Sequence, residues 1–180
     1  MTEEIIIAGF GGQGVLSMGK ILAYSGLMQG QEVSWMPSYG PEMRGGTSNV
    51  TVIISDERIS SPILIKYDTA IILNQQSMDK FEPMVKTGGT LLYDPNGITR
   101  HPERKDINIY KIEATQVAQE MGNPKIFNMV VLGGFLNIKP LVKMDNVIKG
   151  LEKSIPKRHH KLLPLNEEAI KKGQNYVEKV

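Results

Sequence analysis

Residues 5–15 read Ile5-Ile6-Ile7-Ala8-Gly9-Phe10-Gly11-Gly12-Gln13-Gly14-Val15, and this stretch decides the fold class. Its first four residues form a short apolar run, which is typical of a strand buried on both faces of a parallel sheet. From Val15 onward, apolar residues recur at helical spacing until Gly30, which indicates a helix. A strand, a glycine turn and a helix in this order open a βαβ unit, so the sequence predicts an α/β domain.

The rest of the chain continues this alternation. Further strands are expected at residues 32–36, 49–54, 69–74, 90–93 and 107–111. Further helices are expected at residues 77–86, 115–121, 128–138, 145–153 and 166–180. We expect Ser77 to cap the 77–86 helix and Asn166 to cap the last one. Because 180 residues suffice for one core, we predict a single domain over residues 1–180, a three-layer α/β/α fold with a Rossmann-like, largely parallel sheet.

The composition and charge of the chain argue against several classes of function. The chain has no cysteine, so it cannot hold an iron–sulfur cluster or use a thiol nucleophile, and its three histidines lack the spacing of a metal site. A net charge of +2 does not favour nucleic-acid binding. No apolar run approaches the ~20 residues of a membrane span, and the acidic Thr2-Glu3-Glu4 start is unlike a signal peptide. We therefore expect a cytoplasmic protein with no bound metal and no nucleic-acid or membrane partner.

The glycine turn matches G-x-G-x-x-G and lies between a predicted strand and a predicted helix. There, glycines let the backbone approach an anion, whose charge is favoured by the helix N-terminus. A dinucleotide site also needs an acid at the end of the second strand, where Ser34-Trp35-Met36 stands instead, so NAD is weakly supported. An anion site and a turn built only for tight helix–sheet packing both remain open. The candidate cofactor-binding residues are Gly9, Gly11, Gly12, Gln13 and Gly14.

A second candidate is the loop at residues 38–48, which is rich in turn formers and follows a predicted strand. Its candidate substrate-binding or interface residues are Tyr39, Glu42, Arg44, Gly45, Gly46 and Thr47. The Arg44 guanidinium suits a bidentate pair with a carboxylate or phosphate, and the two glycines leave their N–H groups approachable. The alternative is an internal Glu42–Arg44 pair or a protein contact that orders the loop.

Three stretches together resemble the gamma subunit of 2-oxoacid:ferredoxin oxidoreductases. They are Ile-Ala-Gly-Phe-Gly-Gly-Gln-Gly-Val (residues 7–15), Pro-Ser-Tyr-Gly-Pro-Glu-Met-Arg-Gly-Gly-Thr-Ser-Asn (37–49) and Val-Ile-Ile-Ser-Asp-Glu (52–57). The resemblance extends over essentially the whole chain. It implies an enzyme complex that decarboxylates a 2-oxoacid on thiamine diphosphate and Mg²⁺, passes electrons through iron–sulfur clusters to ferredoxin, and transfers the acyl group to coenzyme A.

The resemblance also implies that this chain is a non-autonomous subunit. The Gly-Asp-Gly…Asn-Asn pattern of a thiamine diphosphate site and all cysteines are absent from it. We therefore assign no catalytic residue and no cofactor to this chain alone, and we expect alpha, beta and delta subunits as partners that carry those groups. The gamma-type chain is expected to assist assembly and coenzyme A binding, with Arg44 gripping a phosphate or a substrate carboxylate. In isolation we expect it to form a homodimer.

Alternatives remain. The smaller subunit of an indolepyruvate-type oxidoreductase looks similar, and the 2-oxoacid itself, whether 2-oxoglutarate, a branched-chain 2-oxoacid or pyruvate, cannot be read from this sequence. A free-standing nucleotide-binding Rossmann module would need the missing ribose-binding acid. A purely structural assembly protein is the third class, and it predicts that changes in the glycine turn affect assembly but not kinetics.

Overall fold

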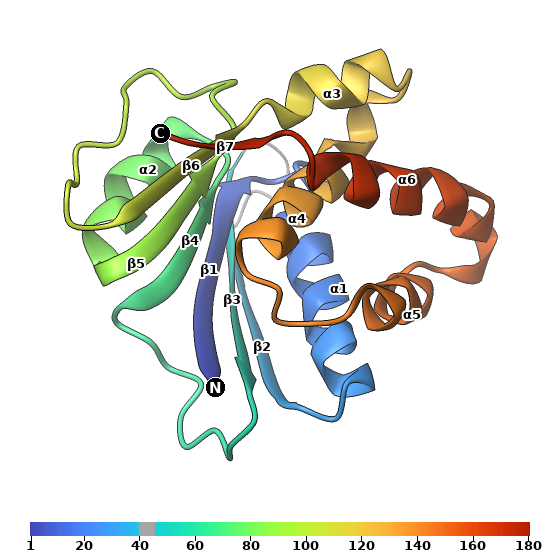
Figure 1. The fold of residues 1–180 in the computed structure, drawn as a ribbon, viewed down its shortest axis with the longest axis horizontal. Helices are drawn as coiled ribbons and strands as arrows, with labels where there is room; N and C mark the ends of the chain where they lie inside the picture. The colour runs from blue at the N-terminus through green and yellow to red at the C-terminus, as the bar shows by residue number, and fades with distance from the viewer. Residues whose placement is uncertain (40–45) are drawn as a thin grey trace.

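The computed structural model describes residues 1–39 and 46–180, which form one sheet of order β2-β3-β1-β4-β5-β6-β7 with helices on its faces (Figure 1). The strands are β1 (Thr2–Phe10), β2 (Glu32–Tyr39), β3 (Thr47–Ser55), β4 (Tyr67–Ile72), β5 (Val85–Tyr93), β6 (Asn108–Ile112) and β7 (Val177–Lys179). The α-helices are α1 (Val15–Met28), α2 (Gln75–Phe81), α3 (Ala114–Glu120), α4 (Phe127–Ile138), α5 (Met144–Ser154) and α6 (Leu163–Gly173). Short 3-10 helices are η1 (Glu82–Met84), η2 (Pro124–Ile126) and η3 (Lys157–Leu162).

The sheet is mixed, and its central strands are parallel. β1, β4, β5 and β6 pair in parallel, whereas β3 is antiparallel to both β1 and β2, and β7 is antiparallel to β6. The predicted largely parallel sheet is confirmed. Because β3 lies between β1 and β2, the connection through α1 passes over one strand before it reaches β2, which a Rossmann unit with adjacent first and second strands does not do.

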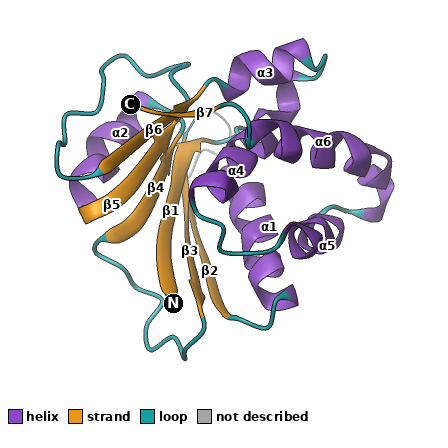
Figure 2. Cartoon of the chain, viewed as in Figure 1, coloured by secondary structure: helices purple, strands orange, loops and turns teal. Residues whose placement is uncertain are grey.

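The two faces of the sheet are covered by different helices (Figure 2). Ile5 and Ile7 face a core that also contains apolar residues of α1, α3, α4, α5 and α6. Ile6 and Ala8 face a second core, to which α2 contributes Phe81. Successive side chains of a strand point to opposite faces, so burial on both sides explains why β1 is apolar without alternation. The predicted three-layer α/β/α arrangement is confirmed.

Helices α4 and α6 cross at two glycines. A methyl group on Gly133 would overlap the backbone carbonyl oxygen of Ile170, and one on Gly173 would overlap that of Val130. Each glycine therefore lets the backbone of the other helix approach directly. The apolar pattern predicts a helix at residues 128–138, and the close approach of α6 explains why Gly133 stands there although glycine lowers helix propensity.

Three predicted helix boundaries were wrong. Helix α2 is capped by Asn74 and not by Ser77, because Asn74 leaves β4 with extended backbone and its Oδ1 accepts the Ser77 N–H at 2.8 Å. The last helix ends at Gly173, and residues 177–179 form β7. Asn166 lies inside α6, where its Nδ2 donates to the Leu162 carbonyl at 2.8 Å. Residues 177–179 therefore pair with the edge of β6, although local propensity favours continuing the helix through them.

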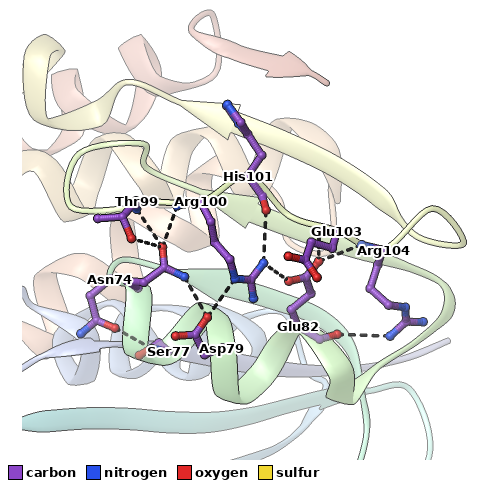
Figure 3. A network of polar contacts seen from close by, with 10 residues as sticks. Asn74, Ser77, Asp79, Glu82, Thr99, Arg100, His101, Glu103 and Arg104 are labelled. Carbon is purple, nitrogen blue, oxygen red and sulfur yellow. Dashed lines mark hydrogen bonds and ion pairs between the residues drawn. The ribbon is translucent and has the colours of Figure 1, made fainter.

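The connection between β5 and β6 is held to η1 by one buried carboxylate (Figure 3). The Glu82 side chain is 3% exposed, and its Oε2 lies 2.8 Å from Arg100 Nη1. Its Oε1 accepts the backbone N–H groups of Glu103 and Arg104 at 2.5 and 2.9 Å. Arg104 also pairs with Asp106 and lowers the pKa of that carboxyl. A long surface segment without regular structure is therefore fixed to the second face of the sheet.

Candidate functional site

The glycine turn lies at the carboxyl end of β1 and leads into α1. Gly12 and Gly14 adopt left-handed backbone with φ of 94° and 73°, which only glycine adopts without strain. Gly14 is the N-cap of α1, so no side chain caps this helix, and its first turn contains no acidic residue. Within residues 1–39 and 46–180, no acceptor is bonded to the first N–H groups of α1, and the helix dipole favours negative charge at this position.

Gln13 closes the turn from inside. Its Oε1 accepts the Phe10 N–H at 2.6 Å, and its Nε2 donates to the carbonyl oxygen of Leu73 at 3.2 Å. Leu73 directly follows β4, so the side chain of Gln13 ties the turn to the neighbouring parallel strand. Both polar atoms of this side chain are used within the chain. Gln13 therefore shapes the turn, and the atoms that could meet a ligand are the backbone N–H groups around it.

The second sequence motif lies beside the first. β3 pairs with β1 so that Thr47 is opposite Phe10, and Gly11 donates its N–H to the Gly46 carbonyl at 2.8 Å. The backbone of Tyr39 is in register with Ser48, so both ends of the intervening loop are held by the β2–β3 hairpin. Glu42, Arg44 and Gly45 lie outside the described residues. The glycine turn and the described ends of the second motif, Tyr39 and Gly46–Ser48, thus border the same edge of the sheet.

Asn128 is a site residue that the sequence analysis did not identify. It is buried at the N-terminal end of α4, and its Nδ2 donates to the Gly14 carbonyl at 3.3 Å. A methyl group on Gly14 would overlap this amide. The N-terminal ends of α1 and α4 therefore meet at Gly14, and both dipoles favour negative charge there. The only local signal was a polar residue at the start of a largely apolar helix.

Asp94 stands at the carboxyl end of β5, but its hydrogen bonds are used internally. Its Oδ2 accepts the N–H and hydroxyl of Thr115 at 3.0 and 2.7 Å, and its Oδ1 accepts the Asn96 N–H at 2.9 Å. Burial raises the pKa of Asp94, although the hydrogen bonds from Thr115 and Asn96 act in the opposite direction. We interpret this carboxylate as the anchor of α3, because three donors already occupy it.

Residues 1–39 and 46–180 contain neither a cluster of metal-ligating side chains nor a membrane-spanning helix. Within those ranges no three His, Asp or Glu side chains gather closely enough to hold a metal ion. None of the described helices combines the length and the apolar character that a membrane crossing requires.

The mixed sheet and the G-x-G-x-x-G turn after its first strand define a Rossmann-like domain. It differs from the usual Rossmann arrangement at one edge, where the β2–β3 hairpin brings the end of a second loop to that turn. Residues 4–176 match the model of the pyruvate ferredoxin/flavodoxin oxidoreductase family. The chain therefore belongs to this family, and the resemblance drawn from residues 7–15, 37–49 and 52–57 is confirmed.

Curated relatives of two sizes match. The 2-oxoglutarate synthase subunit KorC of Methanocaldococcus jannaschii is 38% identical over 161 residues, which cover 87% of this chain and 86% of KorC. The ketoisovalerate oxidoreductase subunit VorA of Methanothermobacter marburgensis is 42% identical over 130 residues, which cover 72% of this chain but 27% of VorA. The match thus spans about a quarter of the length of VorA.

Two solved structures share the fold. The gamma subunit of a keto/oxoacid ferredoxin oxidoreductase from Geobacter sulfurreducens has a TM-score of 0.84 and 28% identity, with 98% of this chain and 96% of that chain covered. The 2-oxoglutarate:ferredoxin oxidoreductase of Magnetococcus marinus, solved with 2-oxoglutarate, coenzyme A and succinyl-CoA bound, has a TM-score of 0.86 and 26% identity. Coverage there is 97% of this chain and 30% of that chain.

Proposed function

We propose that this chain is the gamma-type subunit of a 2-oxoacid:ferredoxin oxidoreductase complex. The complex would oxidatively decarboxylate a 2-oxoacid, form the acyl-CoA and reduce ferredoxin. Support comes from KorC, which matches over nearly its full length, and from the gamma subunit of Geobacter sulfurreducens. Because this sequence has no cysteine, the alpha, beta and delta partners would carry the iron–sulfur clusters as well as thiamine diphosphate and Mg²⁺.

Within that complex, we assign the glycine turn and the loop beside it to coenzyme A. One observation carries this assignment: Gly11 donates to the Gly46 carbonyl, so both motifs border the uncapped start of α1. The pyrophosphate of coenzyme A is the kind of anion that such a helix N-terminus accepts. The space around Gly12 fits this role, because a methyl group there would meet no atom within 4 Å.

The residues of this chain would bind and orient the thioester-forming substrate and would perform no bond-breaking step. Backbone N–H groups at the start of α1 would hold phosphate oxygens, and Asn128 would keep the Gly14 carbonyl turned away from them. Arg44, in the same loop as Gly46, would take a phosphate or the substrate carboxylate by a bidentate pair. Coenzyme A supplies the thiol that accepts the acyl group when it is bound.

Replacing Gly12 with Ala tests the turn. We expect the KM for coenzyme A in the assembled complex to rise about tenfold, equivalent to ~1.4 kcal/mol. Alanine is strained in the left-handed conformation of Gly12, so the turn must distort to relieve that strain. Gly30→Ala is the matched control, since Gly30 has a φ of 84° and equally open surroundings but follows the C-terminal end of α1, at the opposite end of that helix from the turn. Both variants should lose about 1–2 kcal/mol of stability. Equal KM values for coenzyme A in the two variants would contradict the assignment.

Replacing Arg44 with Ala tests the loop. We expect the KM of one anionic substrate to rise about tenfold, because a bidentate charged pair is lost. A rise for coenzyme A places Arg44 on a phosphate, and a rise for the 2-oxoacid places it on the substrate carboxylate. Arg58→Ala removes an exposed arginine of the turn after β3 and serves as control. If both KM values stay unchanged in an intact complex, Arg44 does not belong to the site.

The substrate is identified by assaying the complex itself. The complex purified anaerobically through this chain would be tested for dye reduction with 2-oxoglutarate, branched-chain 2-oxoacids, pyruvate and indolepyruvate, each with and without coenzyme A. Activity that requires coenzyme A with one of these acids supports the proposal and separates the indolepyruvate-type alternative. The free-standing nucleotide-binding module loses support from the topology, because β2 is separated from β1 and bears no acid at its end.

A further inference from the structure

β2 forms one edge of the sheet, and its outer side pairs with no other strand of residues 1–39 and 46–180 (Figure 1). Its adjacent residues Trp35 and Met36 are 39% and 38% exposed, and neighbours in a strand point to opposite faces. The only charged residue of β2 is Glu32 at its start, and Pro37 interrupts the far part. Natural edge strands usually carry lysines or bulges against pairing, so the stretch 32–36 is unusually open to a further strand.

A groove runs beside this edge. A hollow of about 270 Å³ lies between α1, β2 and the segment that follows α5. We call it the Trp35 groove, and its walls include Leu16, Ser17, Lys20, Ile21, Trp35 and Ile155. A second hollow of about 290 Å³ continues along α1 and shares Lys20 and Trp35 with the first. Exposed tryptophan in an apolar hollow is typical of the centre of a protein interface.

Among the described residues, Lys20 is the one charged residue that lines the Trp35 groove, and no carboxylate lines it. Lys20 forms no ion pair with any carboxylate in the part of the chain that the structure describes, and its ammonium lies 5.9 Å from the centre of the Tyr24 ring. Ser17, one turn before Lys20 on α1, is exposed and also lines the groove. Past Pro156 the chain continues with the basic residues 157–161. The charge of this region therefore complements an acidic group.

We propose that the open edge of β2 and the Trp35 groove dock an extended, acidic segment of a partner subunit. The segment would add a strand along residues 32–36, place an apolar side chain beside Trp35 and bring a carboxylate to Lys20. A polypeptide is favoured over a small molecule because only another strand can pair with the row of free backbone groups along an edge. This inference rests on the proposed function, which makes the chain a subunit of a larger complex.

Relatives of greater length give independent support. Residues similar to this domain make up 27% of VorA and 30% of the Magnetococcus marinus chain. In those proteins further polypeptide is covalently attached to the same domain. A surface that meets neighbouring polypeptide is therefore expected on this fold, and the Trp35 groove with its adjacent edge combines exposed apolar side chains, a free edge and an uncompensated cation.

Hydrogen exchange read by mass spectrometry tests the proposal. The outward-facing amides of residues 32–36, which do not bond to β3, are expected to exchange at least tenfold more slowly in the purified complex than in the isolated chain, because a newly paired edge is protected. Chemical cross-links from this edge should reach an acidic segment of one partner subunit. Unchanged exchange would overturn the proposal. Protection that develops in the isolated chain at high concentration would assign the edge to a second copy of this chain. Protection that needs only coenzyme A would assign the groove to the nucleotide. Either outcome would overturn the proposal.

A charge reversal gives the second readout. Lys20→Glu should weaken binding of the partner subunits about tenfold, whereas Lys149→Glu, the same change at an exposed position of α5, should not. Changing the cross-linked partner carboxylate to lysine should restore binding to the Lys20→Glu chain; equal affinities for the two variants contradict the charge contact. These readouts do not depend on turnover. A complex that protects β2 but lacks 2-oxoacid activity would refute the proposed function and leave the docking surface standing.

Discussion

Gly133→Ala is expected to destabilise the folded chain by about 3 kcal/mol, at the upper end of the cost of inserting a methyl group into a packed interior. The added methyl overlaps the carbonyl oxygen of Ile170, which is backbone and cannot rotate away. Alanine raises intrinsic helix propensity by ~1 kcal/mol, and this gain offsets only part of the cost of separating α4 from α6. Urea unfolding of the isolated chain, followed by circular dichroism, measures the change.

The same crossing supplies a reciprocal test and a control. Gly173→Ala should cost a similar amount, and the double variant should cost less than the two single changes combined, because helices already moved apart accommodate the second methyl more easily. Asn137→Ala changes an exposed residue of α4 and should shift stability by no more than ~0.5 kcal/mol. A Gly133→Ala chain as stable as the Asn137→Ala chain would show that α4 and α6 are not in this close contact in solution.

Glu82→Ala is expected to release the connection between β5 and β6 and to lower stability by about 2–3 kcal/mol. The substitution removes the partner of Arg100 and the acceptor of two backbone N–H groups, those of Glu103 and Arg104. Removing one partner from a buried ionic contact is costly because it leaves the other polar groups unsatisfied. Urea unfolding gives the change in stability, and faster trypsin cleavage after Arg100 and Arg104 reports release of this segment (Figure 3).

Asp79→Ala is the control for that prediction. Asp79 also pairs with Arg100, at 2.9 Å, but its side chain is 58% exposed. Exposed ion pairs contribute roughly 0–1 kcal/mol, so this variant should keep both its stability and its resistance to trypsin. If Asp79→Ala and Glu82→Ala are cleaved at the same rate, the segment is held by something other than the buried carboxylate.

Local patterns predicted most elements of the fold but not all of their neighbours. The apolar run of β1 and the helical spacing after Gly14 are properties of contiguous residues, and they located β1 and α1 well. The order of the strands cannot be predicted in this way, because a strand pattern such as that of residues 50–54 does not indicate the direction of the strand or the strand it pairs with. The insertion of β3 between β1 and β2 therefore could not be derived from periodicity. The short β7 was missed because residues 174–180 lack alternating apolar positions.

The candidate site was also predictable only where its residues are contiguous in sequence. The glycine turn was recognisable because strand, glycines and helix follow one another directly in sequence. Its contact with Gly46 depends on the register of β1 with β3, and its contact with Asn128 joins residues 114 positions apart. Side-chain packing across such separations is set by the whole fold. Sequence therefore indicated where an anion could bind, and the structure was needed to show which elements surround that position.

The register of the β2–β3 hairpin has a consequence for how this family could diversify. Tyr39 and Ser48 are opposed across the hairpin, and Gly46 is bonded to the glycine turn, so residues 40–45 are bracketed by fixed backbone at both ends. A segment bracketed in this way can be exchanged whole, in length or in chemistry, while both strands keep their alignment. On the proposed function, grafting the equivalent segment from a relative between these fixed ends would change the ligand preference of the complex, while the packed core would stay the same.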